Sequence, residues 1–120
     1  MAYCGDAPLP RFSSTHITVD EWQRFLAEVT GTSGVRCRDV LTNQLQCDSD
    51  SQATIWIFTR AGHPAHPAVT RAILRASGSQ LGIDRTGHYA GSESAFRAWM
   101  SQFVALDQKS VNEWSRAVRR

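Results

Sequence analysis

The stretch ATIWIFT, residues 53–59, decides the fold of this 120-residue chain. Its side chains alternate along an extended backbone, so that Thr54, Trp56 and Phe58 line one side. Ile55 and Ile57 line the other side. Apolar and β-branched residues on both sides are typical of a strand that lies inside a sheet and is covered on each face. The sequence therefore predicts a sheet built around this strand.

Two short extended segments upstream of this strand are typical of a β-hairpin. Cys37 and Cys47 flank the segment VLTNQ, residues 40–44, and a turn centred near Thr42 would place the two cysteines opposite each other. Opposed strand residues have Cα atoms about 4.5–5.5 Å apart, which overlaps the separation that a disulfide needs. We therefore predict strands at 35–40 and 44–48, joined by a Cys37–Cys47 disulfide. The alternative is a pair of reduced cysteines in a cytosolic hairpin.

Helical patterns surround these strands. A capping box from Thr18 to Glu21 precedes apolar residues at helical spacing, which predicts a helix that ends at Gly31. Residues 67–77 carry an apolar stripe behind a proline, and residues 92–104 and 110–118 each begin with a serine cap, so three further helices are expected. Glycines within residues 82–91 flank apolar residues, which predicts a short strand near 82–90.

The expected architecture is one α+β domain, residues 16–120, behind an extended N-terminal leader, residues 1–15. Its small antiparallel sheet consists of the hairpin 35–48, strand 53–59 and the short strand near 82–90, and three to four helices cover it. A chain of 13.3 kDa with 42% hydrophobic and 20% charged residues matches one compact domain.

Charge and hydropathy exclude two classes of partner. The net charge is +2 and the basic residues are scattered, whereas a protein that binds nucleic acid needs a dense basic stripe. No run approaches the roughly 20 apolar residues of a membrane span. We expect neither nucleic-acid binding nor a membrane span.

Compartment is predicted from the cysteines. A disulfide implies an oxidising compartment, so we expect a periplasmic or secreted protein whose signal peptide is absent from the sequence given. Cys4 has no evident partner in the sequence. The motif Cys-Gly-Asp resembles the acylated cysteine of a lipoprotein, so a lipid anchor at Cys4 is one interpretation, and a free thiol in a loose segment is the other.

The candidate functional segment is RAGHPAHP, residues 60–67, directly after the central strand. Two prolines stiffen it, so it would lose little entropy on binding and can be presented to a partner as a preformed surface. We predict Arg60, His63 and His66 as partner-binding residues, with Tyr89 beside them. In the structural alternative, the two histidines only satisfy nearby backbone groups.

The sequence contains no recognisable motif for a catalytic or metal site. His63 and His66 could bind one transition metal, but no HExxH or paired-Cys motif supplies a third ligand, so no metal or cofactor is predicted. A serine activated by His63, His66 or His88 would form a hydrolase, yet no Gly-x-Ser-x-Gly motif occurs. We predict no catalytic residue and no enzyme. A small His-dependent hydrolase and a lipid-anchored envelope structural protein are the alternative functions.

The strand WIFT (residues 56–59), the loop GHPAHPA (residues 62–68) and the glycine-rich segment before a helix with Phe and Trp resemble small exported bacterial proteins. Some proteins of this kind are immunity proteins that neutralise interbacterial cell-wall-degrading effectors. The resemblance implies a periplasmic binding or inhibitory role and carries over no binding residue. The functional prediction is a protein-binding module, an immunity protein or inhibitor whose His-Pro loop inserts into or covers the cleft of a peptidoglycan-degrading enzyme.

Overall fold

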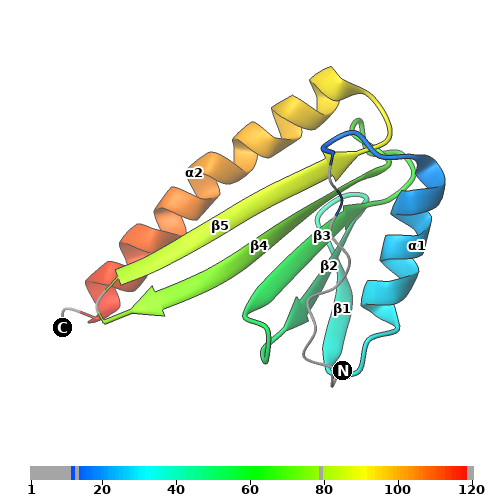
Figure 1. Cartoon of the computed structure of the whole chain (residues 1–120). Coiled ribbons are helices and arrows are strands. Elements are labelled where there is room, and N and C mark those ends of the chain that lie inside the picture. Colours follow the sequence, from blue (N-terminus) through cyan, green and yellow to red (C-terminus); the bar gives the residue numbers. More distant parts are fainter. Residues whose placement is uncertain (1–11, 13, 79, 119–120) are drawn as a thin grey trace.

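The computed structural model describes residues 12, 14–78 and 80–118, which form a five-stranded antiparallel sheet and two helices (Figure 1). Neighbouring strands in the sheet follow the order of the sequence, β1-β2-β3-β4-β5. In chain order the elements are α1 (Val19–Thr30), β1 (Val35–Val40), β2 (Gln44–Ser49), β3 (Thr54–Thr59), β4 (Ala68–Ser77), β5 (Gln80–Tyr89) and α2 (Glu93–Val118).

The predicted hairpin and its disulfide are confirmed. β1 and β2 pair so that Cys37 lies opposite Cys47, with 4.0 Å between their Cα atoms, and the two sulfurs are bonded. The first helix also begins as predicted, because Thr18 accepts a hydrogen bond from the backbone N–H of Glu21 while the Glu21 side chain accepts from the backbone N–H of Thr18. These elements follow from short-range signals.

The prediction of three to four covering helices is wrong, first because residues 68–77 form β4. The register sets Val69 opposite Phe58 and Ile73 opposite Thr54 on the side of the sheet that faces α1. Ala68 and Ala72 then lie on the other side, and both are buried. Apolar residues on both sides of a strand can imitate a helical stripe, and the β-branched residues in this segment favour the strand.

The second error concerns the C-terminal helices. Residues 92–104 and 110–118 were predicted as two helices, but they belong to the single 26-residue helix α2. The intervening residues ALDQK, 105–109, contain no glycine or proline and mostly favour helix, so nothing interrupts the backbone hydrogen bonds. Ser110, predicted as a cap, lies inside the helix.

The two helices cover opposite sides of the sheet. On the α1 side, Trp22, Phe25 and Val29 pack against residues of β2, β3 and β4 that include Trp56 and Phe58. On the α2 side, a second cluster joins the first half of α2 to the sheet; its buried members are Ile57, Ala65, Ala68, Phe96, Trp99 and Phe103. β3 therefore contributes to both clusters, as its alternating pattern predicts.

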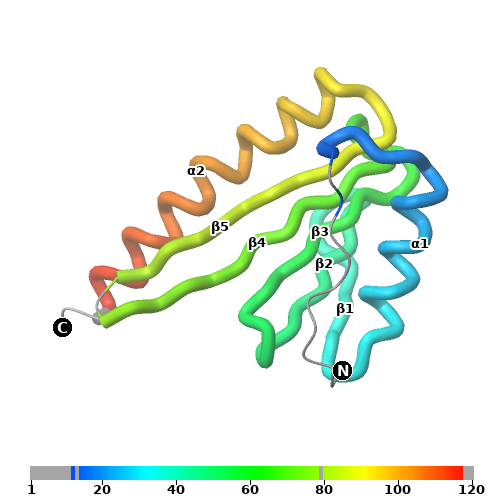
Figure 2. Tube along the Cα trace, in the orientation of Figure 1, coloured from blue at the N-terminus to red at the C-terminus, as the bar shows by residue number. Residues whose placement is uncertain are grey.

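β4 and β5 continue beyond the other strands. β3 pairs with β4 only as far as Ile73, whereas β4 pairs with β5 along its whole length. The trace in Figure 2 shows this long hairpin with α2 running beside it. Among the described residues, no helix is long and apolar enough to cross a membrane.

Most of the predicted leader, including Cys4, lies outside the described residues. The end of the leader and the residues after it are bonded to the end of β5. The Tyr89 N–H donates to the Thr15 carbonyl and the Ile17 N–H donates to the Tyr89 carbonyl, with 2.9 Å between N and O in each bond. His16 and Tyr89 form an isolated parallel bridge at this point.

Candidate functional site

Two loops meet at one end of the sheet and form one continuous structure. The β1–β2 turn and the β3–β4 loop both lie at the upper end of the sheet in Figure 1. The Arg60 backbone N–H donates a hydrogen bond to the Asn43 carbonyl, with 2.8 Å between N and O. The Arg60 guanidinium pairs with Asp39, with 2.7 Å between Nε and Oδ1. We call residues 41–43 together with residues 60–64 the tip surface.

The two histidines of the β3–β4 loop have partners inside the molecule. The ring of His66 packs edge-on against Trp22 of α1, with 5.0 Å between centroids. The ring of His63 packs edge-on against Trp99 of α2 at 5.3 Å, and its Nδ1 accepts a hydrogen bond from Ala65 N–H. The loop is therefore fastened to both helices, and both imidazoles are only partly exposed.

Thr59 and His66 have a geometry that resembles an activated nucleophile. The distance between Thr59 Oγ1 and His66 Nδ1 is 2.8 Å, which is within the range of a nucleophile and its base. However, Thr59 is only 1% exposed, and its hydroxyl also accepts a hydrogen bond from Ala68 N–H. A substrate cannot reach this oxygen in the described structure. The hydrogen bond between Thr59 and His66 therefore has a structural role, since it joins the two ends of the β3–β4 loop.

Burial lowers the pKa of both loop histidines. For His63, burial is the larger cause and the nearby His66 adds to it. For His66, burial lowers the pKa while the hydrogen bond with Thr59 opposes this effect. Both imidazoles are therefore expected to be neutral at pH 7, since the ordinary pKa of histidine is about 6.5. Arg60 carries the charge of the tip surface, and it pairs with Asp39 beside that surface.

Tyr89 lies near the loop but faces α2. Its ring stacks on Phe96, with 4.9 Å between centroids, and lies 5.0 Å from the ring of His16. Its partner in the β4–β5 register is Ala68, the first residue after the loop. Of the four predicted binding residues, Arg60 and His63 belong to the tip surface, while His66 and Tyr89 lie behind it.

Leu41 is the residue of the tip surface that sequence reasoning missed. It is 84% exposed at the end of the disulfide-linked hairpin, and its φ of 47° places it in the left-handed region. This conformation costs a leucine roughly 1–2 kcal/mol. The sequence held one indication of this residue: a leucine stands at a turn position that Gly, Asn, Asp or Ser usually occupies.

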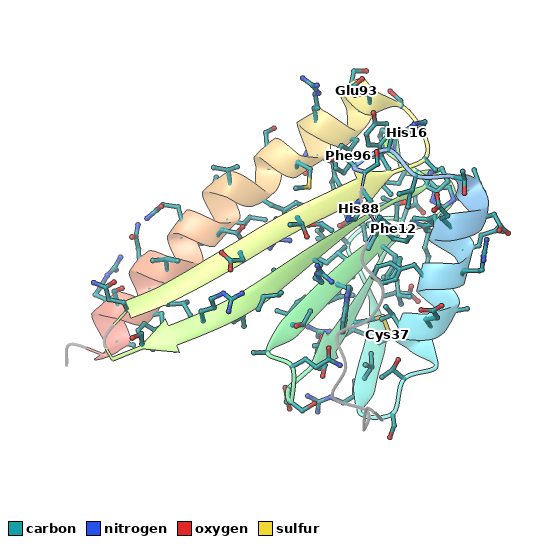
Figure 3. The ribbon with its side chains drawn as sticks, viewed as in Figure 1. Phe12, His16, Cys37, His88, Glu93 and Phe96 are labelled. Atoms are coloured by element: carbon teal, nitrogen blue, oxygen red, sulfur yellow. A yellow bond between two sulfur atoms is a disulfide. The ribbon has the colours of Figure 1, made fainter. Side chains whose placement is uncertain are left out.

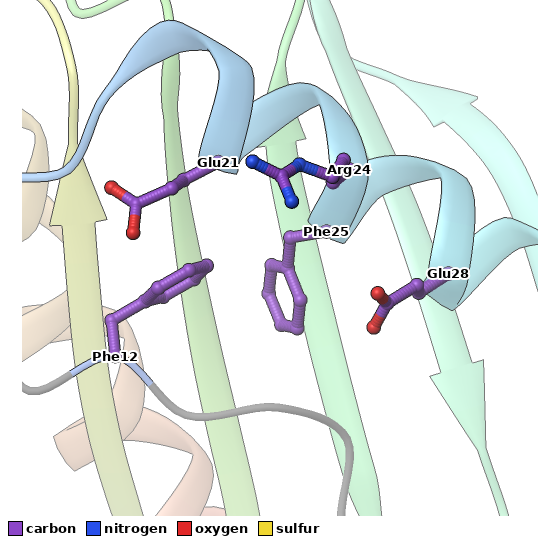
Figure 4. A pocket seen from close by; sticks show the side chains of 5 residues that line it. All are labelled: Phe12, Glu21, Arg24, Phe25 and Glu28. Carbon is purple, nitrogen blue, oxygen red and sulfur yellow. The ribbon is translucent and has the colours of Figure 1, made fainter.

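Among the hollows that the described residues line elsewhere, three have linings that include no residue of the tip surface. One of about 200 Å³ lies between Phe12 and α1 (Figure 4). Another of about 500 Å³ is lined by Phe12 and by residues of β4, β5 and the first half of α2. The third, of about 480 Å³, is an apolar groove between the second half of α2 and the sheet, and it is lined by Ile55, Ala72, Leu74, Leu81, Ile83, Arg85, Asp107, Ser110, Glu113 and Trp114.

The described residues bring together no group of three or more His, Cys, Asp or Glu side chains that could hold a metal ion. His88, the third histidine of the hydrolase hypothesis, donates from Nδ1 to the Ser14 carbonyl over 2.9 Å and packs against Phe12. It lies on β5 opposite Val69, the second residue of β4. The geometry thus gives the histidines structural partners.

Comparison with known proteins assigns no family. No family model matches the chain, and no curated protein and no solved structure matches it closely.

Proposed function

We propose that this protein is a protein-binding module that contacts its partner through the tip surface. The observation that supports this most strongly is Leu41, a large apolar side chain that is 84% exposed and held in a conformation unfavourable for leucine. Backbone strain that persists in a folded protein points to a role other than stability. Apolar anchors of this kind carry much of the energy of a protein interface when they enter a pocket on the partner.

The tip surface is held rigidly before any partner binds. The Cys37–Cys47 disulfide closes the hairpin below Leu41, and the Arg60 hydrogen bond to Asn43 fixes the turn against the neighbouring loop. Aromatic contacts fasten that loop to both helices. A preformed surface pays little conformational entropy on association, which supports binding by a steric plug rather than by an adaptable loop.

The proposed partner is an enzyme with a cleft, and the proposed effect is inhibition by covering or filling that cleft. An exposed leucine at the end of a stiff hairpin has the shape for such insertion. The resemblance to exported bacterial immunity proteins supports a peptidoglycan-degrading effector as the enzyme, and the disulfide supports a periplasmic or secreted location. In this proposal Leu41 and Arg60 contact the enzyme, while His63 and His66 hold the loop in place.

The test is whether this protein binds and inhibits the product of the adjacent gene, for which we expect a cell-wall hydrolase. Leu41→Asp should weaken inhibition at least about tenfold, because burying a leucine contributes about 1.5–3 kcal/mol. Leu106→Asp is the matched control, since Leu106 is 54% exposed on α2, away from the tip surface. Equal inhibition by both variants, or no complex with the hydrolase at all, would contradict the proposal.

A further inference from the structure

β5 forms the edge of the sheet opposite β1, and its outer side carries unpaired backbone groups. At its end, Tyr89 directs both backbone groups outward, because its N–H donates to Thr15 and its carbonyl accepts from Ile17. Backbone groups alternate in direction along a strand, so every second residue upstream also directs its N–H and C=O away from β4. These residues are Leu81, Ile83, Arg85 and Gly87. The described residues give these groups no backbone partner, so β5 presents about 20 Å of unpaired edge.

An extended segment already pairs with one end of this edge. Residues 15–17 run parallel to β5, and His16 and Tyr89 form the isolated bridge there. Figure 3 shows His16 and Phe12 at this end of β5. Phe12 packs against Phe25 of α1 instead of following the edge, so the described pairing ends after two hydrogen bonds. The edge therefore has the geometry that strand pairing requires, and most of its length is unused by the described residues.

The hollow of about 500 Å³ lies beside the same edge, and we call it the edge hollow. Its lining comes from both sides of β5, with Thr86 and His88 on the α1 side and Phe96 and Met100 on the α2 side. Because β4 pairs with the inner side of β5 along its whole length, a hollow lined from both faces of β5 surrounds the outer edge.

Apolar side chains of α2 border this edge. Met100, Val104 and Val111 are spaced at i, i+4 and i+11, which places them on one side of the helix. Met100 lines the edge hollow, whereas Ser110 and Glu113, on the other side of α2, line the groove over β3 and β4. Met100, Val104 and Val111, which we call the outer stripe, therefore lie beside the unpaired edge, and Val104 is 70% exposed.

A second copy of the chain does not fit this edge. α2 lies directly over β5, because a Cβ at Gly87 would lie 2.8 Å from side-chain atoms of Met100 and Phe96. Two copies paired antiparallel through β5 would have these strands about 4.8 Å apart and their α2 helices on the same face. Packed helices need about 8–10 Å between their axes. The edge therefore suits an extended segment that carries no helix beside it.

We propose that the outer edge of β5 binds an extended segment of a partner protein by strand addition, with alternate apolar side chains of that segment packed against the outer stripe of α2. Backbone hydrogen bonds to β5 supply affinity, and the stripe selects apolar residues at every second position. The segment has no proline at the positions that bond to β5, because proline lacks the N–H. This site is separate from the tip surface and does not depend on the function proposed for that surface.

Selection of random linear peptides on the full chain tests the site. The selected peptides should share apolar residues at alternate positions, and they should shift the backbone amide signals of Ile83, Arg85 and Gly87 while leaving that of Leu41 in place. A selection that yields no peptide, or shifts centred on the tip surface or on β1, would overturn the proposal. So would a dimer of the protein alone in which the β5 amides are protected from exchange, because a second copy would then occupy the edge.

Two matched comparisons with a selected peptide then separate strand addition from non-specific apolar contact. Val104→Asp should weaken binding at least about tenfold, because burial of a valine side chain is worth that factor or more. Leu106→Asp, an equally conservative change of an exposed residue on the other side of α2, should leave binding unaltered. Equal binding by the two variants would overturn the role of the outer stripe.

The second comparison uses N-methylated forms of the same peptide. An added strand directs every second N–H towards the edge, so methylating one alternate set of nitrogens should abolish binding and methylating the other set should preserve it. Loss of binding in both forms, or in neither, would overturn strand addition.

Discussion

Replacing Asp107 with asparagine should loosen α2 from the sheet. Asp107 receives two hydrogen bonds from Arg85 of β5, with 2.8 Å for each pair of atoms, and the side chains are 22% and 14% exposed. The same guanidinium donates to Thr70 over 3.1 Å and lies 4.3 Å from the ring centre of Phe103. This network ties the middle of α2 to β4 and β5.

The expected cost is about 2–3 kcal/mol. Removing one partner of a buried ion pair costs about 3–5 kcal/mol because the other charge is left without compensation, and the residual exposure of this pair lowers that figure. A domain of this size has a free energy of unfolding of about 5–15 kcal/mol, so the loss would be a large fraction of the total. The Arg85 charge, held in an apolar groove, is the source of the penalty.

Urea unfolding followed by circular dichroism measures this cost. The matched control is Glu93→Gln, which breaks the exposed Glu93–Arg97 pair on the same helix and should cost at most about 0.5 kcal/mol. The double variant Arg85→Met with Asp107→Leu should recover most of the stability, because no charge remains to be desolvated. If Asp107→Asn costs no more than the control, the ion pair does not hold α2 and the reasoning is refuted.

Two further predictions concern packing and pH. Gly87→Ala should destabilise the fold by about 1–3 kcal/mol, because a Cβ there would lie 2.8 Å from side chains of α2. Gly82→Ala should be tolerated, because the nearest atom to a Cβ at this position lies 3.8 Å away. The midpoints of urea unfolding of the two variants test this difference. Burial lowers the pKa of His63, His66 and His88 in the folded protein. Below the ordinary histidine pKa of about 6.5, the unfolded chain therefore binds more protons than the folded protein does. The midpoint of thermal unfolding should be highest above pH 6.5 and should fall as the pH decreases from 6.5 towards 5. A thermal midpoint that rises as the pH decreases from about 6.5 to 5 would contradict the lowered pKa values.

The elements that were predicted correctly are those specified by neighbouring residues. Strand 53–59 shows an uninterrupted two-residue alternation, and the Thr18–Glu21 capping box marks the start of α1 by local hydrogen bonds. The hairpin followed from two cysteines placed symmetrically about a turn. Each of these signals acts over a few residues, so no knowledge of the tertiary structure was needed.

The remaining elements depend on contacts between distant segments. Residues 68–77 satisfy both a helical and a strand pattern, and pairing with β3 and β5 decides between them. The two loop histidines were predicted to face a partner, but their rings meet Trp22 and Trp99, which come from helices at opposite ends of the chain. The turn that carries Leu41 is bonded to the adjacent loop through the Arg60 N–H and the Asn43 carbonyl, a contact that no local pattern reveals.

The most direct test of the central claim is a binding titration of the adjacent gene's product, the proposed hydrolase, with two variants that have the same kind of backbone effect. Leu41 and Ala53 both have left-handed backbone conformations, with φ of 47° and 50°, and asparagine is better tolerated there than either residue. Leu41→Asn and Ala53→Asn should therefore both fold, with stability maintained or raised. We predict that only Leu41→Asn weakens binding, by at least about tenfold, since only it removes the apolar anchor. Unchanged binding by Leu41→Asn, or an equal loss with Ala53→Asn, would contradict the account.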